Sequence, residues 1–133
     1  MFFEYDITVP AQTLASAPTQ TDLPLVWGII DYVGVQIPLG VKALTFLQLW
    51  RGLYQIAPAN PGGWIKGENI VVEWKEEFDL TQPPFFIAAK TYNDDDSYAH
   101  TLTVRVHVNE KAPMLWSTEM LSPQIVPIPK ELM

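Results

Sequence analysis

The densest group of metal-type ligands in the chain is Asp94-Asp95-Asp96-Ser97. Clustered carboxylates suit calcium, but an EF-hand loop also needs a turn glycine at its sixth position and a bidentate glutamate at its twelfth. Counting from Asp94, those positions hold Ala99 and Arg105. Aspartate is also common in turns, because its side chain bonds to the backbone two residues on. We therefore expect a solvated hairpin turn between two strands and no metal site.

A second acidic group, Lys75-Glu76-Glu77-Phe78-Asp79, offers carboxylates for general acid–base catalysis. Glycoside hydrolysis requires two carboxyl groups that face a sugar-sized cleft, and adjacency in the sequence does not establish that geometry. We expect a charged connection outside the core. A hydrolase that uses Glu76, Glu77 or Asp79 is therefore the weakest functional hypothesis for this chain.

The chain has two histidines, His100 and His107, and no cysteine. The histidines are an odd number of residues apart on one predicted strand, so their side chains lie on opposite faces and do not chelate one metal together. The common nucleophile and phosphate motifs, such as G-x-S-x-G, the Walker loop and H-E-x-x-H, do not occur in the sequence. We expect no enzymatic activity, no cofactor and no metal.

Five tryptophans and five tyrosines could supply rings that stack on sugars. Most aromatic residues of a β-domain lie in the core, and Trp74, in phase with Ile70 and Val72, fits that position. Trp64 follows Pro61-Gly62-Gly63 and is the better candidate for an exposed ring. A carbohydrate-binding β-sandwich or adhesion module that stacks a ligand on Trp64 is therefore the second hypothesis.

Two segments alternate strictly between apolar and polar residues, which is typical of strands with one buried face. They are residues 3–9, which end at Pro10, and residues 101–108, where Leu102, Val104 and Val106 share one face. Further apolar runs between turn residues predict the other strands, with looser faces. These runs are Gly28 to Ile37, Ala43 to Trp50, Leu53 to Ile56, Ile70 to Trp74, and Phe85 to Tyr92.

The phase of the apolar residues in the run from Gly28 to Ile37 changes, which predicts a bulge near Gly34. A helix over Val41 to Leu53 is the minority alternative, because Thr45, Phe46 and Trp50 favour a strand. Short strands with turns at close intervals predict an all-β fold. We expect an antiparallel β-sandwich or jelly-roll-like barrel over residues 1–108.

The net charge indicates which classes of partner the chain can bind. With 133 residues the chain forms a single domain, and 15 acidic against 8 basic residues give a net charge of −7. That sign disfavours nucleic acid, which basic surfaces bind.

No apolar run is long enough to cross a bilayer, so no membrane partner is expected. The start, Met1-Phe2-Phe3-Glu4-Tyr5-Asp6, has acids where a signal peptide has bases, so we expect no signal peptide.

The two ends differ from the middle. Residues 10–24 are small, polar and Pro-containing, and predict a long connection or an arm. Residues 109–133 contain four prolines yet are strongly apolar, which predicts an extended C-terminal arm packed against either its own barrel or a neighbouring subunit. Interfaces favour aromatic and methionine anchors. The predicted subunit-interface residues are Met114, Trp116, Met120, Leu121, Ile125 and Ile128.

Four stretches resemble capsid decoration (auxiliary, cementing) proteins of tailed bacteriophages, as in phages of thermophiles. They are residues 5–13 (Tyr5-Asp6-Ile7-Thr8-Val9-Pro10-Ala11-Gln12-Thr13), Ile37-Pro38-Leu39-Gly40, Asn60-Pro61-Gly62-Gly63-Trp64, and residues 92–101, which open with Tyr92-Asn93-Asp94. The resemblance implies a thermostable β-barrel or jelly-roll protomer that is made in the host cytoplasm. It implies a homo-oligomer, with a trimer favoured, on the outer capsid surface of the virion, bound to the major capsid protein shell and reaching its neighbours with arms.

Overall fold

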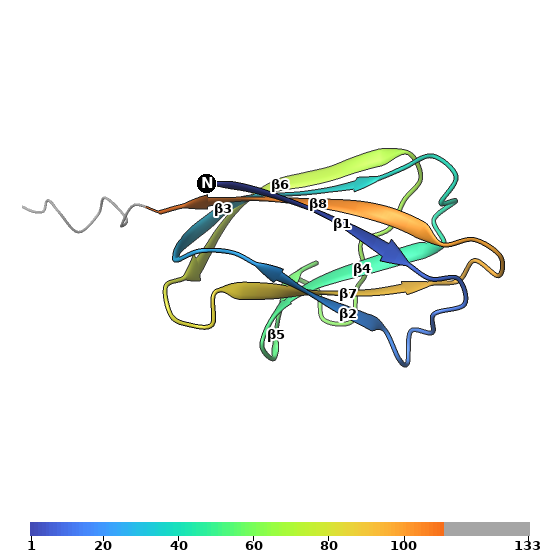
Figure 1. Cartoon of the computed structure of the whole chain (residues 1–133), viewed down its shortest axis with the longest axis horizontal. Helices are drawn as coiled ribbons and strands as arrows, with labels where there is room; N and C mark the ends of the chain where they lie inside the picture. The colour runs from blue at the N-terminus through green and yellow to red at the C-terminus, as the bar shows by residue number, and fades with distance from the viewer. Residues whose placement is uncertain (111–133) are drawn as a thin grey trace, which may run out of the picture.

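The computed structural model describes residues 1–110 of the chain, which form eight β-strands and no helix (Figure 1). None of the elements in this part of the chain is a helix long and apolar enough to span a membrane. The strands are β1 (Phe2–Val9), β2 (Thr19–Pro24), β3 (Gly28–Ile37), β4 (Thr45–Arg51), β5 (Tyr54–Ala57), β6 (Ile70–Leu80), β7 (Phe86–Asn93) and β8 (His100–Asn109).

The strands form two antiparallel four-stranded sheets that lie face to face (Figure 1). Sheet A has the order β1-β8-β3-β6, and sheet B has the order β2-β7-β4-β5. This nested order is the jelly-roll arrangement. The predicted antiparallel β-sandwich is confirmed. The alternative of a barrel is wrong, because the two sheets remain separate and each keeps two edge strands.

The alternation in the first and last strands places the core as predicted. Leu102, Val104, Val106 and Val108 of β8 are all fully buried. On β1, Ile7 and Val9 are buried, whereas the earlier inward residues of that strand are only half-buried. Each fully buried aliphatic side chain contributes roughly 1.5–3 kcal/mol relative to an exposed one. The predicted strand Ala43 to Trp50, in place of the helical alternative over Val41 to Leu53, is also confirmed by β4.

The bulge in β3 lies three residues earlier than predicted. Ile30 pairs with Val108 and Tyr32 with His107, so Asp31 is the extra residue. Gly34 stands in regular register for a different reason. A Cβ on Gly34 would lie 2.6 Å from the hydroxyl oxygen of Tyr32, whose side chain crosses the glycine. The glycine therefore makes room for the ring.

The prediction that residues 10–24 form a connection or arm is wrong for their second half. Thr19–Pro24 is β2, an edge strand that pairs with β7. Its inward residues are threonines except for Leu23, which is 1% exposed. A single large apolar side chain gives almost no periodic signal, which explains the error.

The charged connection predicted after Trp74 is also wrong, because β6 continues to Leu80. The alternation of half-buried and exposed residues persists through the charged stretch. Glu76 and Phe78 share the inner face with Trp74, whereas Glu77 and Asp79 point outward. The charged residues do not end the strand, because the alternation with a period of two continues through them.

Candidate functional site

The two long sides of the sandwich are closed differently. On one side, β1 and β2 lie against each other, and the Tyr5 hydroxyl donates a hydrogen bond to the Pro24 carbonyl at 2.6 Å. On the other side, the edge strands β6 and β5 border a cleft of about 310 Å³. At this edge the Tyr54 and Phe78 rings stack with centroids 5.8 Å apart.

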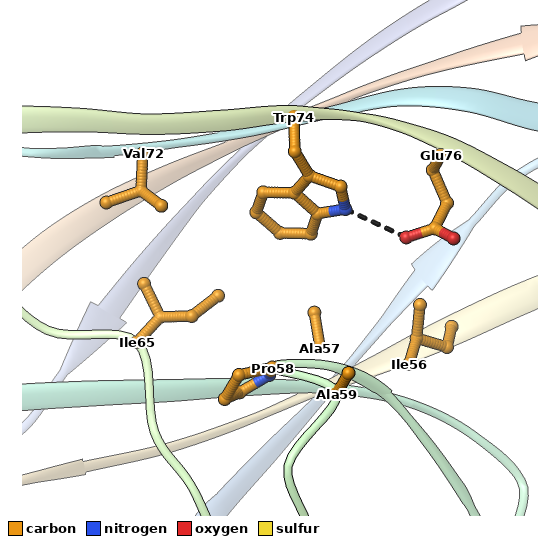
Figure 2. Close-up of a pocket in the computed structure, with 8 residues that line it drawn as sticks. All are labelled: Ile56, Ala57, Pro58, Ala59, Ile65, Val72, Trp74 and Glu76. Atoms are coloured by element: carbon orange, nitrogen blue, oxygen red, sulfur yellow. Dashed lines mark hydrogen bonds between the residues drawn. The ribbon is translucent and has the colours of Figure 1, made fainter.

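Side chains from both sheets form the walls of the cleft (Figure 2). Three residues of β6 point into it from one side, and β5 with the loop that follows supplies the opposite wall. Every lining residue except Glu76 is apolar. The lining residues are Ile56, Ala57, Pro58, Ala59, Ile65, Val72, Trp74 and Glu76.

Hydrogen bonds hold the loop wall in place. Ile65 forms a bridge with Leu47 of β4, with N···O distances of 2.8 and 3.0 Å, which turns its side chain inward. The Gln55 side chain donates to the Pro58 carbonyl at 2.6 Å and accepts from the Gly62 amide at 3.3 Å. Since these bonds fix the loop from within, the cleft is preformed.

Glu76 provides the polar group of the cleft. The indole N–H of Trp74 donates to its Oε1 at 2.8 Å (Figure 2). Within residues 1–110, no lysine or arginine forms an ion pair with Glu76. Its second oxygen accepts only a long hydrogen bond, 3.4 Å from the Glu77 amide, and can also bind a cation, so the cleft suits an apolar group that carries a positive charge at one end. The strand places Glu77 and Asp79 on the other face, so the three carboxylates do not converge on one sugar-sized cleft.

A cluster of aromatic residues covers part of the outer face of sheet B. Phe46 and Tyr92 are cross-strand partners, and their rings stack 4.4 Å apart at an interplanar angle of 8°. Trp64 meets Tyr92 edge to face, with centroids 4.7 Å apart at 86°. Trp64 is half-buried, because its neighbour Ile65 is anchored to β4. The ring predicted to stack on a ligand is therefore also a packing partner of Tyr92.

Two lysines lie over this aromatic face. The Lys90 ammonium is 4.1 Å from the centroid of the Trp50 ring, and the Lys66 ammonium is 5.9 Å from that of Phe46. The Trp50 indole N–H donates to the Gln48 side chain at 2.9 Å. Burial raises the pKa of the Tyr92 hydroxyl, and the negative charge of Asp94 raises it further. The face thus combines aromatic surface with positive charge on an acidic protein.

The outer face of sheet A has a different character. Arg105 forms an ion pair with Glu4 at 3.0 Å and donates to the Gln36 side chain at 2.8 Å. The Tyr32 hydroxyl donates to Glu73 at 2.8 Å, and this bond is the largest cause of the raised pKa of Tyr32. Exposed polar pairs of this kind contribute roughly 0–1 kcal/mol each. These pairs make the face mainly polar, although Phe2 and Val71 are also exposed on it.

The acidic stretch 94–97 forms a turn around Asp95. One Asp95 oxygen accepts the Ser97 and Tyr98 amides at 2.9 and 3.1 Å, and the other lies 2.8 Å from the His100 ring. The Ser97 amide, and next the His100 side chain, hold the pKa of Asp95 below its usual range. The turn was predicted, but it joins β7 of one sheet to β8 of the other and is not a hairpin.

The buried side chain of Asn93 fastens this turn to the sandwich. Its amide nitrogen donates to the Val9 and Tyr98 carbonyls at 3.2 and 2.9 Å. Its oxygen accepts the Asp95 amide at 2.9 Å and the Thr45 hydroxyl at 3.3 Å. Asn93 therefore connects three strands and the turn.

Neither histidine contributes to a shared ligand set. His107 lies 2.6 Å from a carboxylate oxygen of Asp31, the bulge residue, whereas His100 contacts Asp95 in the turn. The residues that the structure describes contain no group of three or more metal-type ligands. The predicted interface residues lie outside the described part of the chain. They are Met114, Trp116, Met120, Leu121, Ile125 and Ile128.

Comparisons with known proteins identify no family for this chain. No protein family and no curated protein matches the sequence. The chain is similar to a solved structure described as "Crystal structure of PirA", with 22% sequence identity and a TM-score of 0.32. That alignment covers 78% of this chain and 93% of the other. A TM-score this low carries no argument about this chain.

Proposed function

We propose that this chain is a non-enzymatic structural protein of a phage virion. In this role it is a capsid decoration protein that oligomerises, with a trimer favoured. It binds the major capsid protein shell on the outside of the head and stabilises the head by clasping neighbouring subunits. The fold is compatible with this role, since jelly rolls occur in viral capsid proteins and in lectins. Because one fold serves many functions, the proposal depends on the surfaces.

The observation that carries the proposal is the contrast between the two outer faces. Sheet A presents a polar network, whereas sheet B presents Phe46, Trp50, Trp64 and Tyr92 with two lysines beside them. Protein interfaces are enriched in aromatic residues, and anchors of this type carry most of the binding energy. Sheet B is therefore the face that we assign to the contact with the shell.

The sequence after the sandwich supports the clasping part of the proposal. Residues 111–133 combine prolines with apolar anchors such as Trp116 and Ile128. Fully extended, these 23 residues reach roughly 75 Å. Prolines reduce the entropy that a segment loses when it docks.

Co-sedimentation with purified tailed-phage heads that lack their decoration protein tests the proposal. We expect the full chain to pellet with the heads and light scattering to give a multiple of the protomer mass. Trp50→Ala should weaken binding about thirtyfold, the equivalent of about 2 kcal/mol for an interface anchor. Tyr32→Ala removes an aromatic ring from sheet A and is the matched control. Equal loss in both variants, or no binding to any head with a monomeric protein, overturns the proposal.

The second candidate is a carbohydrate-binding module. It is favoured by the contact between the Trp64 and Tyr92 rings, which lies on the same face as the Lys66 and Lys90 ammonium groups. A glycan array with the wild-type chain and Trp64→Ala tests it. Glycan binding that the substitution abolishes would favour the module over the decoration protein. An array without binding would remove this candidate.

A further inference from the structure

We propose that the apolar cleft between β5 and β6 receives the C-terminal segment of a neighbouring copy of this chain. The segment is Ile125-Val126-Pro127-Ile128-Pro129-Lys130, with its aliphatic residues in the cleft and the Lys130 ammonium at Glu76. This inference rests on the proposed function, because it names the surface on which the clasp closes.

The chemistry of the cleft matches that of the segment. The cleft of about 310 Å³ is apolar except for Glu76, which lies beside Trp74 (Figure 2). At the volume of liquid water it holds about ten molecules, which apolar side chains displace favourably. The carboxylate lacks an ion-pair partner within residues 1–110, and Lys130 directly follows an apolar stretch. The segment therefore provides the apolar group with one terminal positive charge that the cleft suits.

The backbone also offers a mode of attachment. β5 and β6 are edge strands, each paired on one side only among the described strands. An extended peptide adds to such an edge through main-chain hydrogen bonds. Prolines 113, 123, 127 and 129 all stand at odd positions, so in an extended segment their missing N–H groups face the same side. The amides of Val126, Ile128 and Lys130 face the other side. Such a segment can pair with one edge and cannot template a further strand.

The length of the connection permits the segment to reach a neighbouring copy. Asn109 pairs with Ile29 at the end of the sandwich where β6 finishes at Leu80. From there to Trp74 is about 20 Å along the strand. The residues between Glu110 and Ile125 span roughly 50 Å when extended, more than the chain needs to reach its own cleft. That excess suits a clasp between two copies.

The absence of cysteine from the sequence permits a clean cross-linking test. The full chain with Ala59→Cys at the lip of the cleft and Ile128→Cys in the segment is oxidised and run on a non-reducing gel. We expect most of the protein as disulfide-linked species of two or more chains. The control pairs Ile128→Cys with Thr8→Cys, an exposed site on β1 at the opposite edge of sheet A, and should cross-link less than one-tenth as much.

A charge exchange provides a second test. Glu76→Lys should weaken self-association at least tenfold by light scattering, and adding Lys130→Glu should restore it. Thermal unfolding of both variants checks that the sandwich is intact.

The outcomes separate this inference from the proposed function. Equal cross-linking in both cysteine pairs, or none, overturns the cleft assignment, and an intrachain disulfide overturns the neighbouring copy. If oligomers still form and bind heads in either case, the proposed function stands. If the wild-type chain is monomeric and binds no head, the function itself fails.

Discussion

Asn93→Ala should destabilise the sandwich more than its single side chain suggests. Asn93 is fully buried and makes four side-chain hydrogen bonds, to Val9, Thr45, Asp95 and Tyr98. A hydrogen bond contributes about 1 kcal/mol net, and a buried group left unpaired costs about 1–3 kcal/mol. The hydrogen bonds to Asp95 and Tyr98 are only partly buried, whereas those to Val9 and Thr45 are buried, so their partners would be left unpaired. We expect the free energy of unfolding to fall by about 2–4 kcal/mol.

Urea and thermal unfolding followed by circular dichroism measure this loss. For a domain of this size the change lowers Tm by about 10 °C. Thr45→Val is the matched control, since it removes one long hydrogen bond and keeps the volume, and should cost less than about 1 kcal/mol. Asn93→Asp should lower the free energy of unfolding more than Asn93→Ala at neutral pH, because it places a buried carboxylate against the Val9 and Tyr98 carbonyls. This stability should recover as the pH falls and the carboxylate is protonated. If Asn93→Ala costs no more than Thr45→Val, the argument for Asn93 is refuted.

Four further predictions follow from the same geometry. Leu102→Ala empties a fully buried position and should cost about 2–5 kcal/mol in urea unfolding, so a loss below 1 kcal/mol would contradict the assigned core. The lowered pKa of Asp95 makes its folded carboxylate stabilising above the unfolded pKa of 3.8, and this stabilisation disappears as the pH falls through the folded pKa. Asp95→Asn should flatten the acid limb of a Tm-against-pH curve, and an unchanged curve would exclude Asp95 as its source. Added calcium or zinc should leave Tm unchanged, since a ligand that binds only the folded state raises it, and a rise of several degrees would reveal a metal site. A chain that stops after Glu110 should still fold, because the eight strands of the described residues precede that point, whereas its oligomerisation should weaken; an unfolded product would place the tail in its own core.

The sequence predicts the strands whose apolar residues alternate without interruption. Residues 3–9 and 101–108 identified β1 and β8, because each strand has one wet face and one buried face. The predictions miss β2 and end β6 too early, at Trp74, because these edge strands bury little. β2 has only Leu23 as a large inward residue, and β6 alternates aromatic and aliphatic residues with charges. In β6 the period of two identifies the whole strand, whereas β2 gives almost no periodic signal.

The candidate cleft was beyond sequence reasoning for a different reason. Its walls come from β6 and from the loop after β5, segments that local patterns do not relate to each other. Trp74 was correctly placed on an inward face, but its bond to Glu76 depends on β6 continuing past the charges. The bulge was predicted from a phase change, and its position at Asp31 was not, because a phase change locates a bulge only to within a few residues.

The nested strand order has a consequence for biosynthesis. β4 and β5 are the only neighbours in a described sheet that are also consecutive in the chain, and β1 pairs with β8 roughly a hundred residues later. At about 5–20 residues per second, the ribosome needs on the order of 5–20 s to deliver the partner of β1. During that interval the apolar residues of the first strand have no sheet to join. Nascent chains that stall before β8 will thus expose aggregation-prone surface, and high contact order will keep refolding slow.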